Sequence, residues 1–288
     1  MRVCLYWNRT AGGGASLDEL KQAIGRAGHH ITRVVSRPDE LSHNHTQDVD
    51  CVAAAGGDGT IARAGRLLAG GTIPLAIVPM GTANNIATSL GIVGTLDEVV
   101  ARWAGRNVVG VNVGSVAGAG DDHRHFFEAV GCGLVTDCIE HGGRTLAKDD
   151  PDDHLDAARQ MYLDRLERMK PSRYTVTMDD EVVEGDYLLV EVLNTAQVGP
   201  GLALASNVSP SDGLLSVVAL TEADRPRLIE YLQGLRDERS PEPPFQSWRS
   251  RCVQISGGGG VHVDDLVLPK PTRPLDIELK AGYLPILA

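Results

Sequence analysis

The chain has 288 residues, of which 42% are hydrophobic and 23% are charged, a balance typical of a globular protein with one large domain or two ordinary ones. The formal net charge of −11 argues against a general nucleic-acid binder and against recruitment to anionic membranes through a polybasic segment. The five cysteines are scattered without zinc-site spacing, and no apolar run approaches the roughly 18–20 residues of a membrane span. We therefore expect a soluble protein of the reducing cytoplasm.

Strand-like and helix-like segments alternate along the first part of the chain. Short apolar runs at residues 3–7, 31–35, 51–55 and 74–78 predict strands. Helical patterns follow three of them, over residues 17–27, 59–69 and 82–90, and Ser16 is a suitable N-cap for the first helix. Strands that alternate with helices indicate βαβ units and a mostly parallel sheet.

The pattern changes near residue 106. Residues 174–178 and 275–279 alternate apolar and polar side chains, as half-buried strands of antiparallel sheet do. One helix is clear, because apolar side chains recur at helical spacing from Leu155 to Met169, with Asp152 or Asp153 as its expected cap. The sequence thus predicts an α/β domain followed by a β-rich domain with inserted helices, and a cleft between them is the default ligand site.

The most informative segment is Gly56-Gly57-Asp58-Gly59-Thr60, which joins an apolar strand to a helical pattern. Glycine allows close approach of the backbone to an anion, and N–H groups at a helix N-terminus face such an anion. This arrangement predicts a phosphate site with the Asp58 carboxylate beside it. An ordinary tight turn between strand and helix is the alternative interpretation.

Two further loops favour the phosphate site. Residues 8–14 (Asn-Arg-Thr-Ala-Gly-Gly-Gly) follow the first strand, and residues 79–85 (Pro-Met-Gly-Thr-Ala-Asn-Asn) follow the strand at 74–78. In a parallel sheet all three loops lie at the carboxyl ends of the strands, where open α/β sheets bind ligands. None is a Walker A loop or a dinucleotide-type GxGxxG motif.

With these loops the chain resembles the diacylglycerol kinase catalytic-domain family, which includes bacterial lipid kinases and sphingosine kinases. The family's NPxSGxG-like loop, its GGDGT loop and its PLGTxND-like stretch correspond to residues 8–14, 56–60 and 79–85. A later Asn and an Asp-Gly pair correspond to Asn194 and Asp212-Gly213. GGDGT also occurs in NAD kinases, whereas the segments at 81–84 and 212–215 favour the lipid kinases.

The resemblance implies a fold of the class α/β plus β. A three-layer α/β nucleotide-binding domain would span residues 1–106, and a C-terminal tail of about residues 281–288 would pack back on it. An antiparallel β-sandwich with inserted helices would form the substrate domain over residues 107–288, with the site between the two domains.

The resemblance also implies an activity, the ATP-dependent transfer of a γ-phosphoryl group to a hydroxyl of a lipid or amphiphilic, diacylglycerol-like alcohol, with ATP and Mg²⁺. Asp58 would be the general base or would position magnesium, and Asp212 would be a metal ligand. The implied nucleotide-binding residues are Asn8, Thr10, Gly12, Gly13, Gly56, Gly57, Gly59, Thr60, Gly81, Thr82 and Asn84.

The sequence departs from the family at the end of the sandwich. Asp264-Asp265-Leu266 stands where the family has Asp-Gly-Glu, so leucine replaces the glutamate. We take Asp265 as the second catalytic acid, although Asp264 stays open, because a shift of one residue reverses side-chain facing in a strand. Ser216 also stands where an acid often follows Asp-Gly-x-Leu, which leaves Asp212 with fewer partners.

Two alternatives stay open. The shared GGDGT loop and the acidic charge would suit an NAD-kinase-like enzyme, and Leu266 in place of the glutamate would suit a catalytically weakened protein that binds nucleotide or lipid. The expected partners are ATP and the acceptor alcohol, with transient contact at a membrane surface and no nucleic acid. The sequence leaves open the acceptor's identity and the oligomeric state, a homodimer included.

Overall fold

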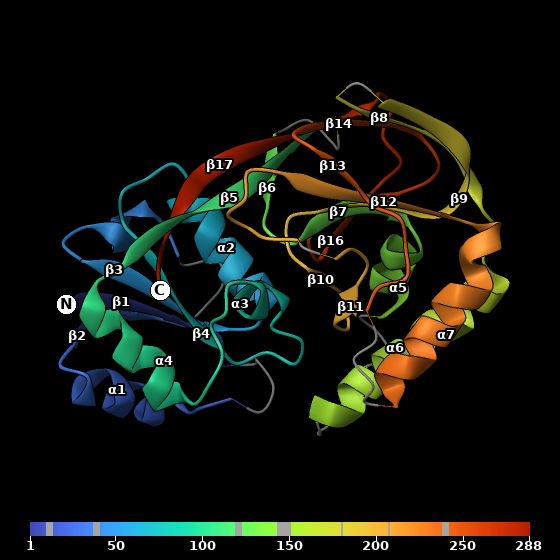
Figure 1. Cartoon of the computed structure of the whole chain (residues 1–288). Coiled ribbons are helices and arrows are strands. Elements are labelled where there is room, and N and C mark those ends of the chain that lie inside the picture. The colour runs from blue at the N-terminus through green and yellow to red at the C-terminus, as the bar shows by residue number, and fades with distance from the viewer. Residues whose placement is uncertain are drawn as a thin grey trace.

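The computed structural model of the chain describes residues 1–9, 14–36, 41–118, 123–142, 151–179, 181–206, 208–237 and 242–288. Figure 1 shows an α/β part that holds strands β1 to β4 beside a larger part built mainly of antiparallel strands. One hydrogen-bonded sheet runs through both parts, because β17 (Leu275–Leu287) pairs with strands of each.

The α/β part contains a parallel sheet. Its strands are β1 (Arg2–Trp7), β2 (His30–Val35), β3 (Cys51–Gly56) and β4 (Leu75–Pro79), in the spatial order β2-β1-β3-β4. At the edge of β4, Ile286 and Leu287 of β17 pair in parallel with Leu75 and Ala76. The C-terminal end of the chain therefore completes the N-terminal sheet.

Successive side chains of these strands pack on opposite faces of the sheet. On one face they contact α1 (Leu17–Arg26) and α4 (Leu96–Arg102), and on the other α2 (Asp58–Leu68) and α3 (Asn85–Ser89). Two buried clusters result, and the expected three-layer α/β arrangement with a parallel sheet is confirmed.

The larger part is an antiparallel β-sandwich, as expected. The short 3-10 helix η3 (Trp103–Gly105) precedes its first strand, and we propose the domain boundary near residue 106. Its strands are β5 (Val108–Ala117), β6 (Arg124–Phe126), β7 (Ala129–Gly133), β8 (Ser172–Met178), β9 (Glu181–Leu193), β12 (Leu215–Thr221), β13 (Trp248–Ser250), β14 (Cys252–Gly257), β15 (Val261–Val263), β16 (Leu266–Leu268) and β17.

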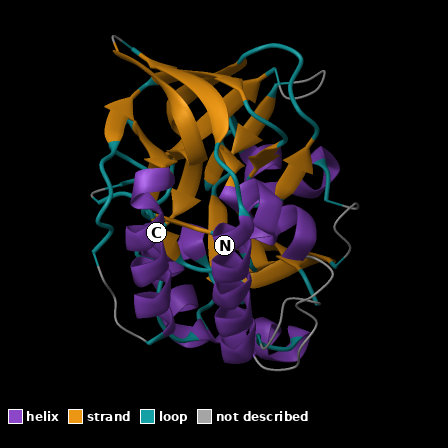
Figure 2. Ribbon diagram, turned by 90° about the vertical axis from the view of Figure 1, so that its right-hand side faces the viewer, coloured by secondary structure: helices purple, strands orange, loops and turns teal. Residues whose placement is uncertain are grey.

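Three inserted helices, α5 (Leu134–Gly142), α6 (Pro151–Arg168) and α7 (Arg225–Arg236), cover one face of this sandwich. Figure 2 shows two long helices in front, below the strands of the sandwich. A separate small hairpin is formed by β10 (Gln197–Val198) and β11 (Leu202–Ala203), and short 3-10 helices lie at His43–Thr46 (η2) and Glu222–Asp224 (η4).

The helix boundaries differ from expectation at two places. The third helix, expected from residue 82, begins only at Asn85, because Asn84 adopts a left-handed conformation with φ 52°. Helix α6 begins at Pro151, so Asp152 and Asp153 lie within its first turn and not at the expected N-cap position. The expected cap of α1 is confirmed, since Ser16 forms a capping box with Glu19.

Among the described residues, no helix is long and apolar enough to cross a membrane. The five cysteines are free thiols, and all but Cys252 are buried.

Candidate active site

The Gly56–Thr60 segment forms a tight turn between β3 and α2. The N–H groups of Thr60 and Ile61 donate to the carbonyl oxygen of Gly57 at 2.9 and 3.1 Å, so the helix begins directly after the strand. A Cβ atom on Gly56 would lie 2.4 Å from Thr60 Oγ1. This contact explains why glycine is needed where the chain turns.

The second glycine loop packs directly on the first. A Cβ atom on Gly81 would lie 2.5 Å from the Cα atom of Gly57, so the two backbones meet without side chains between them. Met80 N donates to Gly56 O at 2.9 Å and fixes this approach. The structure thus brings these two predicted loops together at the carboxyl edge of the sheet, and the two described end residues of the third loop, Asn8 and Gly14, lie against Thr60 and Met80.

Asp58 connects these two loops. Its Oδ2 accepts the N–H of Asn85 at 3.0 Å, and its Oδ1 accepts the N–H of Ile86 at 2.9 Å. Burial raises the pKa of the Asp58 carboxyl, and the two N–H donors oppose this shift. The side chain predicted as a general base therefore also caps the start of α3.

The two asparagines predicted to contact the nucleotide form hydrogen bonds within the loops. Asn8 Nδ2 donates to the Thr60 hydroxyl at 3.2 Å. The Asn84 side chain accepts from Gly81 N at 2.8 Å and donates to Gly81 O at 2.7 Å. Both shape the loops, whereas Thr82 lines the neighbouring cavity. Thr10, Gly12 and Gly13 lie outside the described residues.

The sandwich contributes the turn between β15 and β16, where Val263 pairs with Leu266 and two aspartates form the turn. Asp264, with φ 51°, is buried. Its Oδ1 accepts the N–H groups of Phe127 and Glu128 at 2.9 Å each, and its Oδ2 accepts Arg66 Nη1 at 2.8 Å. Asp264 therefore joins three segments of the fold, because both of its carboxylate oxygens accept hydrogen bonds from other segments.

Asp265 is exposed and lines the cavity. A Cβ atom on Gly59 would lie 2.8 Å from Asp265 Oδ2, so this carboxylate lies directly over the glycine loop. The turn thus separates the two aspartates, with Asp264 buried in the fold and Asp265 facing the cavity. Leu266, at the position of the family's glutamate, is 43% exposed.

Glu128 also lies at this site, and sequence reasoning missed it. It is 8% exposed, and its Oε1 accepts Asn85 Nδ2 at 2.7 Å and Gly199 N at 2.9 Å. Burial, followed by the charges of Asp58 and Asp264, raises its pKa well above the ordinary value. The one available signal was a single acid inside the apolar run at residues 126–130, since acids are rarely buried without partners.

Asp212, predicted as a metal ligand, forms an ion pair with Arg249. The same guanidinium donates to Ser216 Oγ at 2.9 Å. Within the part of the chain that the structure describes, no three His, Cys, Asp or Glu side chains gather as a metal site. Arg249 thus supplies a positive charge beside the predicted ligand.

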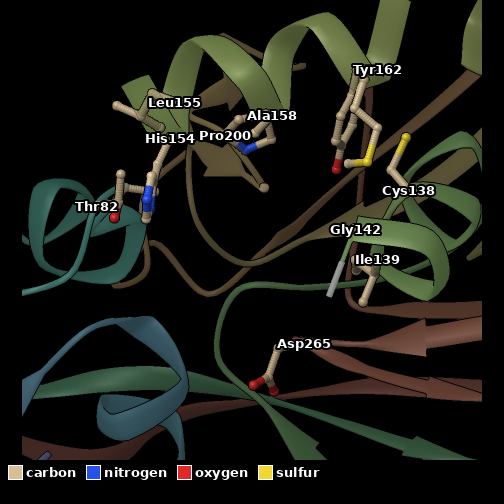
Figure 3. Close-up of a pocket in the computed structure, with 13 residues that line it drawn as sticks. Thr82, Cys138, Ile139, Gly142, His154, Leu155, Ala158, Tyr162, Pro200 and Asp265 are labelled. Atoms are coloured by element: carbon tan, nitrogen blue, oxygen red, sulfur yellow. The ribbon is translucent and has the colours of Figure 1, made fainter. Parts of the chain in front are cut away.

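A cavity of about 630 Å³ opens beside the glycine loops (Figure 3). Its wall is mainly apolar and comes from α5 and α6, and Asp265 lies across it from Leu155 and Ala158. The lining residues on the helices are Cys138, Ile139, Gly142, His154, Leu155, Ala158, Met161 and Tyr162, and those on loops are Thr82, Ala83, Gly199, Pro200 and Asp265.

Two families match successive stretches of the chain. Residues 2–116 match the diacylglycerol kinase catalytic domain, and residues 157–287 match the YegS C-terminal NAD kinase beta sandwich-like domain. The first stretch contains the glycine loops, and the second contains Asp264 and Asp265.

Individual relatives agree with both matches. A diacylglycerol kinase from Mycobacterium tuberculosis is 26% identical over 293 residues, covering 94% of this chain and 91% of the relative. A probable lipid kinase YegS from Escherichia coli is 28% identical over 210 residues, covering 69% of this chain and 66% of the relative. The solved structure of a diacylglycerol kinase from Bacillus anthracis has a TM-score of 0.76 at 22% identity, covering 99% of this chain and 96% of that one, and so shares the fold. Residues 2–116 therefore belong to the diacylglycerol kinase catalytic domain family and residues 157–287 to the YegS-like C-terminal domain family, and the chain's relatives include a bacterial diacylglycerol kinase and a probable lipid kinase.

Proposed function

We propose that the chain transfers the γ-phosphoryl group of ATP to a hydroxyl group of a lipid or another amphiphilic alcohol. The observation that carries this proposal is the position of Asp265, whose carboxylate lies over the glycine loop and on the wall of the apolar cavity. An alcohol whose apolar portion fills the cavity would present its hydroxyl between this carboxylate and the loop.

The glycine loops suit the phosphates of ATP. The backbones of Gly57 and Gly81 meet without side chains, and α2 begins at the loop with its N–H groups toward it. Thr82 adds a hydroxyl on the cavity wall. Transfer of a phosphoryl group depends mainly on such positioning and on electrostatic stabilisation.

Magnesium fits the same place. Kinase sites hold Mg²⁺ through one or two carboxylates together with the nucleotide phosphates, so a larger cluster of protein ligands is not required. Asp58 is the carboxylate at the loop that would hold it. The ion would neutralise phosphate charge while the nucleotide is bound.

We assign acceptance of the hydroxyl proton to Asp265. Within the described residues its carboxylate makes no hydrogen bond, and it faces the cavity. Both oxygens of Asp58 already accept backbone N–H groups, which supports a role in holding the two loops and in positioning magnesium. A carboxylate within reach of the alcohol satisfies the geometric requirement for a general base.

The proposal is tested by incubating the purified chain with γ-labelled ATP, Mg²⁺ and a panel of acceptors. The panel contains diacylglycerol, monoacylglycerol and sphingoid bases in mixed micelles, together with glycerol and NAD⁺ as soluble acceptors. We expect label in an amphiphilic acceptor and none in glycerol. Label in NADP alone would assign the NAD-kinase-like activity, and binding of ATP without transfer to any acceptor would overturn the kinase proposal.

A further inference from the structure

Glu128 occupies the junction between two walls of the cavity. One wall contains Thr82 and Ala83, which directly precede the loop residues Asn84 and Asn85, and the other contains Gly199 and Pro200. These walls come from the α/β part and from the sandwich. Side chains that join them therefore control the width of the cavity.

Three hydrogen bonds join these walls. Glu128 Oε1 accepts Asn85 Nδ2 at 2.7 Å and Gly199 N at 2.9 Å. Asn85 Nδ2 also donates to Gly199 O at 2.9 Å and closes the triangle. One carboxyl oxygen thus contacts both walls at once.

The main chain of Glu128 is also fixed. Its N–H donates to Asp264 Oδ1 at 2.9 Å, and its carbonyl oxygen accepts Asn194 N at 2.9 Å. Asn85 is 1% exposed and Glu128 is 8% exposed, so water does not readily replace these contacts. A buried donor that loses its acceptor is costly, which makes the arrangement rigid.

The contact extends to the helical wall of the cavity. Gly199 has φ 58°, and a Cβ atom on it would lie 2.6 Å from the Tyr162 hydroxyl oxygen. A shift of Gly199 would therefore move it against α6. Through these contacts, Glu128 fixes the positions of both the glycine loop and the Gly199 backbone that packs against the helical wall of the cavity.

We propose that Glu128 is a positioning residue that fixes the Thr82–Ala83 and Gly199–Pro200 walls relative to one another and thereby sets the affinity of the cavity for the acceptor alcohol. The inference rests on the proposed function, because it takes the cavity as the acceptor site. Glu128 is not among the described residues that line the cavity, so it acts through Asn85 and Gly199 and not on the acceptor itself.

The experiment compares Glu128→Ala with Glu128→Gln. Alanine leaves Asn85 Nδ2 and Gly199 N without their acceptor, whereas the glutamine amide oxygen can accept the same two hydrogen bonds. Glu191→Ala is the matched control, since Glu191 is another fully buried glutamate of the sandwich outside the cavity lining. Steady-state kinetics are measured with ATP and with the best acceptor of the panel.

We expect Glu128→Ala to raise the KM for the acceptor about tenfold or more while the KM for ATP stays within about twofold, because a small misplacement of binding groups has effects of this size. Glu128→Gln should restore the wild-type KM to within about threefold. An unchanged acceptor KM in a folded Glu128→Ala protein would overturn the proposal. A kcat lost equally in Glu128→Gln and Glu128→Ala would also overturn it, since that result assigns a direct catalytic charge.

Hydrogen exchange without substrates provides a readout that does not require activity. Glu128→Ala should increase amide exchange at Gly199 and its neighbours in residues 197–203, and neither Glu128→Gln nor Glu191→Ala should do so. If no acceptor is phosphorylated by the wild type, the proposed function fails while this measurement still tests the junction. Unchanged exchange at Gly199 in Glu128→Ala would show that Glu128 does not hold the wall.

Discussion

The carboxylate of Asp265, on the sandwich, occupies the space that a side chain at Gly59 of the glycine loop would need. A Cβ atom on Gly59 would lie 2.8 Å from Asp265 Oδ2, closer than a carbon and an oxygen atom normally approach. Glycine at position 59 therefore provides the space that the carboxylate needs. Gly59 lies within helix α2 and not at a left-handed position, so its conformation alone does not explain the residue.

Gly59→Ala should accordingly lower activity without weakening the fold. The added methyl group displaces the Asp265 carboxylate, and we expect kcat to fall about tenfold or more. Alanine stabilises a helix by up to about 1 kcal/mol relative to glycine, so the melting temperature should not decrease. Gly25→Ala in α1 is the control, since a Cβ atom there meets no described atom within 4 Å. Equal activity of the two variants would contradict the contact.

Replacement by asparagine should affect the stability of the chain differently at Asp264 and at Asp265. Asp264→Asn should destabilise the chain by about 2–3 kcal/mol, because an amide nitrogen would face either the two backbone N–H donors or Arg66. Asparagine tolerates the left-handed conformation at φ 51°, so backbone strain adds little. Urea unfolding measures the change, and a loss no larger than that of Asp265→Asn would show that Asp264 is not structural.

The sequence was sufficient to place the glycine loops. Their positions after apolar strands located them at one edge of a parallel sheet, and the structure packs Gly57 against Gly81 there. The start of α3 could not be predicted, because Asn84 interrupts the helical pattern through hydrogen bonds with the Gly81 backbone. Helix propensity favours a helix from residue 82, but the hydrogen bonds of the Asn84 side chain with the Gly81 backbone override it.

The roles of the acids depended on tertiary contacts. Sequence alone left Asp264 and Asp265 as alternatives, because the facing of each was decided by a left-handed residue in a two-residue turn. Glu128 was missed, since its partner Gly199 lies 71 residues further along the chain. A motif comparison finds residues close in sequence and does not find such a contact.

A larger side chain in the cavity should weaken the binding of acceptors that have a long apolar chain. Ala158→Phe places a ring among the α6 side chains that line the cavity, so the KM for an acceptor with a long chain should rise about tenfold while ATP binding is unchanged. Ala101→Phe, at an exposed position of α4, is the control. A KM that rises for ATP but not for the acceptor would place the nucleotide in this cavity.

Glu191 should make stability fall as the pH rises. It is fully buried, its Oε2 lies 3.4 Å from His262 Nε2, and burial raises its pKa well above the ordinary value of 4.5. Burial lowers the pKa of His262 to about 3, so both groups are neutral. Above pH 4.5 the folded state holds a proton on Glu191 that the unfolded state releases, and each pH unit costs up to about 1.4 kcal/mol.

Glu191→Gln removes this proton. The His262 contribution, which lowers stability as the pH falls from 6.5 toward 3, is common to both proteins and cancels in their difference. Urea unfolding at pH 5 and pH 8 should therefore show the variant gaining stability relative to the wild type as the pH rises. If the variant and the wild type differ in free energy of unfolding by the same amount at both pH values, Glu191 is ionised in the folded state.

In the proposed reaction Asp265 accepts the proton of an amphiphilic alcohol during phosphoryl transfer from ATP. The most direct test is the rate of labelled phosphate transfer by Asp265→Asn, beside Asp186→Asn as an exposed control on β9. We predict that Asp265→Asn lowers kcat by about 10²- to 10⁴-fold, with unchanged ATP binding and melting temperature, while the control keeps wild-type activity. Wild-type kcat in Asp265→Asn would contradict the assignment.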